Sequence, residues 1–220
     1  MSKARSSSVA SVLLMSILTC WCQEARAEEK TEPGASLFQQ SPADWKAEVI
    51  PFPLGFAPDI DYKGVEELRF APGMFKPETD TYFTYAFVWW LEGRPPIDEA
   101  RLKDDLLKYY RGLYRAVSKK EPKHVGSFAL RIEPDGSLEE DGVRKTRYRG
   151  KARWVDPFVT ERDLSLNLRI FHWVCAAQDR TAVLFLATPQ KDGHAVWDSL
   201  SSIKAGACSS GSAGASKPAG

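Results

Sequence analysis

The sequence predicts an α+β fold in which helices pack on an antiparallel β-sheet. The predicted elements run from short strands through one long helix and a series of further strands to a closing helix. Hairpin-length connections between the later strands favour antiparallel pairing. Two of the strands are apolar on both faces, which indicates a sheet that is covered on both sides.

The first part of the predicted sheet comprises Trp45–Pro53, Val65–Ala71 and Tyr82–Leu91. Tyr82–Leu91 carries aromatic or aliphatic side chains on both alternating faces. A sugar-binding platform needs exposed rings beside polar groups, so we expect this segment to be a central strand. For Trp90, next to the turn at 92–94, the sequence leaves open whether the ring reaches the surface.

The long helix follows this strand. Asp98 is a suitable N-cap, and Ile97 and Leu102 are spaced for a hydrophobic staple across it. Apolar residues then recur at intervals of three or four, and charged residues occupy the opposite face. The predicted apolar stripe comprises Leu102, Leu106, Tyr110, Leu113 and Val117.

The second part of the sheet is predicted from strands that alternate with turn signals. Asp135-Gly136 and Asp141-Gly142 predict tight turns. A last helix over Gly193–Lys204 points Val196, Leu200 and Ile203 inward. The predicted strands are Val125–Ile132, Val143–Val155, Leu164–Ala176 and Thr181–Thr188.

The amino terminus predicts a secretory signal at 1–27. Lys3 and Arg5 precede an apolar core at Val9–Leu18, and Ala25-Arg26-Ala27 matches a small-x-small cleavage pattern. We therefore expect cleavage between Ala27 and Glu28, and a periplasmic or extracellular location.

Two alternatives for the amino terminus remain. An uncleaved anchor is one, although the apolar run is shorter than the roughly 20 residues that cross a bilayer. Lipidation at Cys20, within the lipobox-like "ILTC", is the other. No later stretch has the length or apolarity of a transmembrane helix.

Composition divides the rest of the chain into three parts. Residues 28–40 are polar and predict a flexible linker, 41–205 form a single domain, and 206–220 are a Ser/Gly/Ala tail with little to bury. The chain has 30 basic and 29 acidic residues. A polyanion-binding protein normally has a strong basic excess, so nucleic acid is not expected as a partner.

Cys175 and Cys208 remain after removal of the signal and form a candidate disulfide in an oxidising compartment. The predicted layout brings the end of the closing helix beside the turn that follows Cys175. The alternative is a buried free Cys175 and an unpaired Cys208 in the tail.

The predicted strand at 143–155 is basic on one face, because Arg147, Arg149, Lys151 and Arg153 occupy every second position. One interpretation is a binding surface for an anionic ligand or an acidic envelope protein. The alternative is a solvated face, with the charges protecting an edge strand from aggregation.

Catalytic and metal-binding motifs are missing from the sequence. His124, His172 and His194 lack metal-ligand spacing, and His172 is expected to be a hydrogen-bonded structural residue. There is no nucleophile elbow or phosphate-binding glycine loop. We predict no cofactor and no metal, while a carboxylate pair on separate loops stays open because it leaves no local signature.

Two segments resemble known proteins. "VEELRFAPGMFKPETDTYFTYAFVWWLEG" is similar to uncharacterised secreted bacterial proteins without an assigned activity. The ending "RTAVLFLATPQKDGHAVWDSLSSIK" resembles the carboxy-terminal part of PsbP-like domains, which implies an α+β sandwich with a binding or assembly role. This resemblance assigns no functional residue.

The leading functional hypothesis is therefore an exported cell-envelope protein that binds a partner or ligand without catalysis. An extracytoplasmic hydrolase with catalytic residues dispersed in loops is the alternative.

Overall fold

The computed structural model describes residues 36–118, 128–206 and 208. Within these residues a seven-stranded antiparallel sheet carries one long helix and a short carboxy-terminal helix, so the predicted α+β fold class is confirmed. The helices are α1, Glu99–Val117, and α2, Val196–Ser201. The strands are β1 Phe38–Gln40, β2 Lys46–Pro51, β3 Gly64–Phe70, β4 Tyr85–Glu92, β5 Ala129–Glu140, β6 Val143–Val155, β7 Asp163–Cys175, β8 Arg180–Thr188 and β9 Lys204–Ala205.

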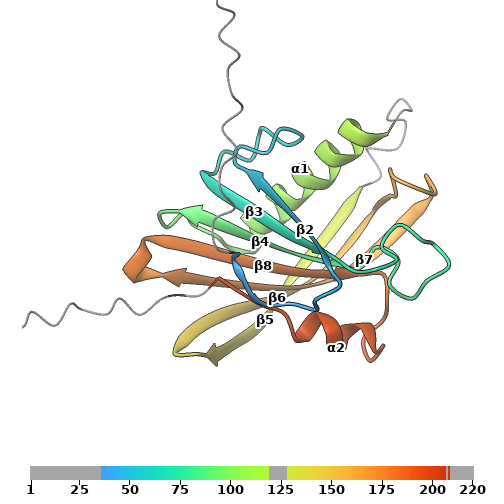
Figure 1. Cartoon of the computed structure of the whole chain (residues 1–220). Coiled ribbons are helices and arrows are strands. Elements are labelled where there is room, and N and C mark those ends of the chain that lie inside the picture. Colours follow the sequence, from blue (N-terminus) through green and yellow to red (C-terminus); the bar gives the residue numbers. More distant parts are fainter. Residues whose placement is uncertain (1–35, 119–127, 207, 209–220) are drawn as a thin grey trace, which may run out of the picture. The chain divides into compact units, whose positions relative to one another are not determined.

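The order of the large sheet is β2-β3-β4-β8-β7-β6-β5, and β1 pairs with β9 in a separate ladder. Helix α1 lies on one face of the large sheet, and α2 lies on the other (Figure 1). β4 is a central strand, as predicted, and its alternation explains why both of its faces are apolar. Phe87 and Trp89 belong to the cluster beneath α1, whereas Ala86 and Val88 belong to the cluster beneath α2.

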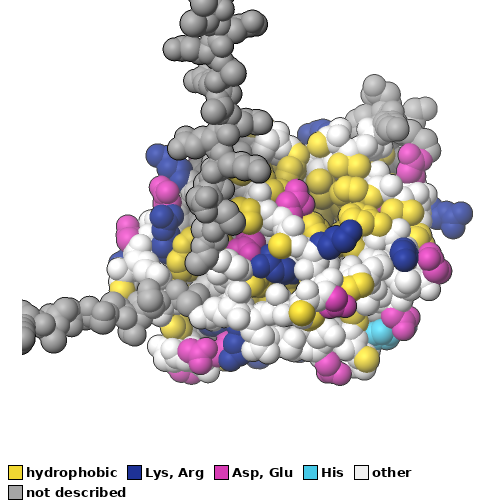
Figure 2. Space-filling model, in the orientation of Figure 1, with side chains coloured by type: hydrophobic (Ala, Val, Ile, Leu, Met, Phe, Trp, Pro, Cys, Tyr) yellow, Lys and Arg dark blue, Asp and Glu magenta, His cyan; other side chains and the backbone are white. Residues whose placement is uncertain are grey.

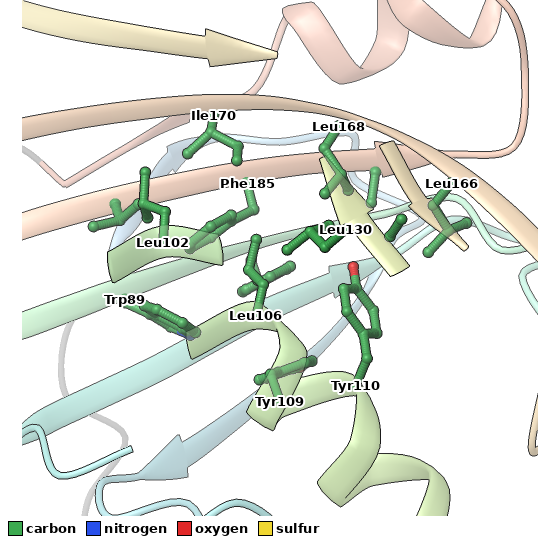
Figure 3. Close-up of a cluster of buried hydrophobic side chains, with 14 of the residues drawn as sticks. Trp89, Leu102, Leu106, Tyr109, Tyr110, Leu130, Leu166, Leu168, Ile170 and Phe185 are labelled. Carbon is green, nitrogen blue, oxygen red and sulfur yellow. The ribbon is translucent and has the colours of Figure 1, made fainter. Parts of the chain in front are cut away.

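The α1 side forms the larger apolar cluster. Leu102, Leu106 and Tyr110 of α1 pack toward sheet residues that include Trp89 and Phe185 (Figure 3). The N-cap prediction is confirmed, since the Asp98 carboxylate accepts a 2.8 Å hydrogen bond from the backbone N–H of Arg101.

The buried face of α1 includes Tyr109 and Tyr114, which the predicted apolar stripe did not contain. Both tyrosines are buried, whereas Leu113 and Val117 are only half-buried. Helix packing therefore leaves two apolar side chains of the last turns incompletely covered.

β4 begins at Tyr85, three residues later than predicted. Residues 81–84 form a turn instead, in which the N–H of Thr84 donates to the carbonyl of Thr81 at 3.0 Å. Phe83 has φ 49°, a left-handed conformation that extended strands do not contain. Trp90 is half-buried against the α2 cluster, which answers the question that the sequence left open.

The turn predicted at Asp135-Gly136 is wrong, because β5 continues through it to Glu140. The strand instead carries a bulge between Pro134 and Ser137, where Gly136 has φ 78°. The turn at Asp141-Gly142 is confirmed, and φ values of 51° and 72° fit the hairpin turn that Asp-Gly pairs favour.

The last predicted helix is shorter than the range 193–204. α2 ends at Ser201, and Lys204–Ala205 pairs with β1 as strand β9. β1 itself falls within 28–40, the range predicted as an unpacked linker. Phe38 is buried there, with the guanidinium of Arg69 4.6 Å from its ring centroid, and this packing orders the segment.

Candidate ligand-binding site

An apolar cavity of about 350 Å³ lies between the end of α1 and one end of the sheet. We call it the α1 cavity. Its walls come from β2, β3, β4, α1 and β6, together with the loop at 71–84 and the turn after Val155. Hydrophobic side chains gather in a hollow on this face of the molecule (Figure 2). Six of the residues that line it are Ile50, Leu68, Phe83, Tyr109, Leu113 and Trp154.

The rim of the α1 cavity exposes two aromatic rings. Phe75 is 49% exposed and Phe158 is 39% exposed, and their ring centroids lie 5.5 Å apart. Both side chains line the cavity. The neighbouring Val159 is also exposed. Exposed apolar groups collected at the mouth of a hollow are typical of a binding site, because isolated surface hydrophobics do not cluster in this way.

The loops that carry these rings are fixed by the carboxylate of Asp156, which is fully buried. Its Oδ2 accepts hydrogen bonds from the Tyr82 hydroxyl at 2.6 Å and from the Thr160 N–H at 2.6 Å. Its Oδ1 accepts from the N–H of Phe158 at 2.8 Å. Burial opposes ionisation of Asp156, but the hydrogen bonds outweigh it and lower its pKa. The cavity mouth is thus built on an ionised, well-bonded side chain.

Glu66 lies directly behind the inner wall of the cavity. It shares one face of β3 with Leu68, and it pairs across the strands with Ile50 of β2 and Trp89 of β4. Ile50, Leu68 and Tyr109 all line the cavity. The side chain of Glu66 is fully buried at 0% exposure.

The hydrogen bonds of Glu66 are incomplete. Oε1 accepts a 3.3 Å bond from the indole N–H of Trp89, but Oε2 has no partner among the described residues. Burial raises the pKa of Glu66 to about 8, the nearby Tyr109 hydroxyl and the Trp89 indole N–H oppose this rise, and the charge of Glu48 adds to it. At neutral pH the side chain is therefore mainly an uncharged carboxylic acid.

The basic face that the sequence predicts lies on β6, and its four residues alternate with Tyr148, Gly150, Ala152 and Trp154, of which all but Gly150 are buried. β6 lies between β5 and β7, so the edge-strand interpretation is wrong. Arg147 donates to the Asp135 carbonyl at 2.7 Å, and Arg149 forms ion pairs with Asp135 at 3.2 Å and with Asp192 at 3.5 Å. The bulge in β5 thus brings an acid onto this face.

The other half of the basic face is different. Lys151 and Arg153 are exposed and form no ion pair with the residues that the structure describes. The positive charges of Arg147 and Arg149 are therefore compensated by nearby acids, whereas those of Lys151 and Arg153 are uncompensated. Glu140, at the end of β5, contacts Lys145 at 2.6 Å and Lys204 at 3.4 Å and forms no ion pair with Lys151 or Arg153.

Cys175 and Cys208 form the predicted disulfide, with Cα atoms 5.1 Å apart. Both cysteines line an open groove of about 570 Å³ between the ends of β6 and β7. His172 also lines this groove, and its buried Nε2 has no hydrogen-bond partner among the described residues, unlike the bonded structural histidine that we expected. Burial lowers the pKa of His172, which keeps the ring uncharged at neutral pH.

Several predictions concern residues outside the described ranges. The signal at 1–27 with its cleavage site at Ala27 and Glu28, residues 28–35 of the linker, residue 207 and the tail at 209–220 are among them. His124 also lies there. Within the described part of the chain, no helix is long and apolar enough to cross a membrane. No group of three or more potential metal-ligating side chains occurs in that part either.

Sequence reasoning missed the buried carboxylates. Glu66, Asp105 and Asp156 are all fully buried, and none of them was among the predicted site residues. For Glu66 a signal existed: strand alternation places it on the same face as Leu68 and Phe70. Asp105 accepts bonds from the Tyr62 hydroxyl at 2.6 Å and from Arg101 Nε at 2.9 Å. No local pattern announces that arrangement.

Comparisons with known proteins identify no relative of this chain. A scan against protein-family models, a search of curated proteins and a search of solved structures each find no match.

Proposed function

We propose that this chain is an exported binding protein that holds a small apolar molecule in the α1 cavity. The observation that carries the proposal is the cavity itself, an apolar space of about 350 Å³ whose mouth exposes Phe75 and Phe158. A well-packed core leaves few voids larger than a water molecule, so a space of this size requires an explanation.

The size of the cavity supports a small-molecule ligand. An engineered apolar cavity of about 150 Å³ takes up benzene, and natural ligand pockets begin at about 300 Å³. The α1 cavity reaches this range. An elongated molecule such as a medium-length alkyl chain fits this space and its open end. A folded protein partner would instead need a broad surface.

Export is supported by the signal-like segment at 1–27 and is compatible with the disulfide between Cys175 and Cys208. Cleavage predicts that the amino terminus of the exported protein is Glu28. Mass spectrometry of that protein tests this point, because a lipid-modified Cys20 would give a different terminus and a larger mass.

The arrangement of the buried acids favours binding over the hydrolase alternative. A hydrolytic site requires catalytic groups gathered around one substrate position. Asp105 is engaged by Tyr62 and Arg101, while Asp156 is engaged by Tyr82 and Thr160. These networks share no residue, so the two carboxylates are not gathered around one substrate position.

The proposal is tested by titration with N-phenyl-1-naphthylamine, an uncharged probe that becomes fluorescent in apolar surroundings. Leu113→Trp replaces an aliphatic side chain of the cavity lining with a bulkier indole ring and should weaken binding by at least about tenfold. Leu107→Trp is the matched control, because Leu107 is half-buried on the same helix and does not line the cavity. Its affinity should stay within about twofold of wild type. Absence of saturable binding to wild type, or equal affinities of the two variants, would overturn the proposal.

A further inference from the structure

A strip of basic side chains lies on the face of the sheet that is turned away from the α1 cavity. Trp154 of β6 lines that cavity, and strand alternation points its neighbour Arg153 to the opposite face. Helix α2 packs on this opposite face, where the Arg169 guanidinium lies 4.0 Å from the ring centroid of Trp197. The part beside α2 we call the β5–β6 strip. Its basic residues are Arg131, Arg149, Lys151 and Arg153.

The loop before α2 shows how this face accommodates two facing cations. Arg149 of β6 and Arg169 of β7 lie directly opposite each other. Like charges in such positions destabilise a sheet. The Asp192 carboxylate bridges them, with Oδ2 3.5 Å from Arg149 Nη1 and Oδ1 2.9 Å from Arg169 Nη2. All three side chains line a hollow of about 140 Å³, so an anion of the chain itself balances this row.

The next row of the strip has facing cations but no bridging anion. Arg131 of β5 and Lys151 of β6 lie directly opposite each other. Glu133 contacts Arg131, whereas Lys151 forms no ion pair with any residue that the structure describes. An open hollow of about 270 Å³ lies at this row. Its charged lining residues are Arg131, Glu133, Arg149 and Lys151.

The spacing of these cations suits a chain of anionic groups. Lys151 and Arg153 are two residues apart on one strand, which separates them by about 7 Å along β6. A single exposed cation holds an anion weakly, because water and salt screen the attraction. Anionic groups linked in one chain bind several such cations together and gain from each contact. Helix α2 rises from the same face (Figure 1), so a narrow chain reaches the strip more readily than a planar bilayer.

We infer that the β5–β6 strip binds a linear acidic polysaccharide, whose sulfate or carboxylate groups pair with Arg131, Lys151 and Arg153. Guanidinium groups suit both kinds of anion, because they donate two parallel hydrogen bonds. The chain as a whole has 30 basic and 29 acidic residues, so the attraction is local to this strip. The strip shares no residue with the α1 cavity, and the inference therefore does not depend on the proposed function.

Titration of a fluorescently labelled heparin octasaccharide with the exported protein, followed by anisotropy, tests the inference. Arg131→Gln with Lys151→Gln should weaken binding by at least about tenfold. Lys103→Gln with Arg115→Gln is the matched control, because it removes the same charge from exposed positions of α1 on the other face. Its affinity should stay within about twofold of wild type. Equal losses in the two double variants, or no saturable binding to wild type, overturn the inference. N-phenyl-1-naphthylamine should bind both double variants as it binds wild type, so the two proposals fail separately.

Salt dependence gives a second readout of the same contacts. The slope of log affinity against log salt concentration reports the number of ionic contacts, and between about 50 and 200 mM salt it should be shallower for Arg131→Gln with Lys151→Gln than for wild type. Equal slopes contradict ionic contacts at these residues. Vesicles of phosphatidylcholine and phosphatidylglycerol test a lipid surface as the partner. Vesicle binding that this variant loses, without binding of the octasaccharide to wild type, overturns the inference in favour of lipid.

Discussion

The hydroxyl of Tyr82 donates a 2.6 Å hydrogen bond to Oδ2 of Asp156, and this bond joins loops that are 74 residues apart in the chain. The Asp156 carboxylate also accepts from the N–H groups of Phe158 and Thr160. One side chain thereby positions the exposed ring of Phe158 at the mouth of the α1 cavity. The geometry of the site depends on this carboxylate as much as on the apolar walls.

Asp156→Asn should lower the free energy of unfolding by about 2 kcal/mol. Oδ2 accepts three bonds, from Tyr82 and from the N–H and hydroxyl of Thr160, and an amide NH₂ group at that position cannot accept them. Urea denaturation measures the loss. Tyr82→Phe, which removes a single donor, should cost about 1 kcal/mol and serves as the control.

The stability difference between wild type and Asp156→Asn should depend on pH in a defined direction. The pKa of Asp156 is lowered in the folded state, so its stabilisation is present above the unfolded-state pKa and is lost as the pH falls through the folded-state pKa. The difference between wild type and Asp156→Asn should therefore shrink in acid. A difference that stays constant through acid pH would show that the charge is not responsible.

Glu66 should make the protein less stable as the pH rises. Its pKa is raised from 4.5 to about 8, so between these values the folded state binds more protons than the unfolded state. The contribution of Glu66 to the free energy of unfolding therefore falls across this window by at most about 5 kcal/mol and is constant above it. Glu66→Gln lacks the titration, so the gap between the two proteins in urea denaturation should widen in favour of the variant from pH 5 to pH 8. A parallel pH profile would contradict the raised pKa.

Removal of the disulfide should lower the free energy of unfolding by about 3 to 4 kcal/mol, the value expected for a closed loop of this length. Cys175 and Cys208 are 33 residues apart and connect the end of β7 with the chain after β9. The double variant Cys175→Ser and Cys208→Ser measures the loss, and unreduced, denatured wild type that begins at Glu28 should show no reactive thiol. Two reactive thiols would contradict the disulfide.

Heparin binding should depend on the uncompensated half of the basic face. Lys151→Glu with Arg153→Glu should weaken binding by at least about fivefold, because these charges have no acid partner among the described residues. Arg147→Glu with Arg149→Glu is the matched control and should have the smaller effect, since Asp135 and Asp192 already engage these side chains. Equal effects of the two double variants would show that the ion pairs do not matter for binding.

Much of the fold could be predicted from local signals. The N-cap at Asp98, the turn at Asp141-Gly142 and the central position of β4 are confirmed because each depends on residues close together in sequence. The predictions for Asp135-Gly136 and for the start of β4 are wrong for the opposite reason. A glycine at positive φ serves a bulge as well as a turn, and the strand partner decides between them.

The candidate site was not predictable to the same degree. Its walls come from segments between Glu48 and Phe158, and nothing in any one segment indicates which others it meets. Glu66 is the partial exception, because its alternation with Leu68 and Phe70 placed a carboxyl group on an apolar face. Its missing hydrogen-bond partner is visible only when the neighbouring strands are in place.

The sequence by itself determined the α+β class, the long capped helix, the basic alternation on β6 and the pair of cysteines available for a disulfide. These features follow from periodicity, capping and composition, which act over a few residues. Only the tertiary structure decided that an apolar cavity remains between α1 and one end of the sheet, and that the Glu66 carboxyl group is fully buried near it. Such features arise from contacts between distant segments, and burial, unlike helix or strand periodicity, is a property of the whole packed molecule.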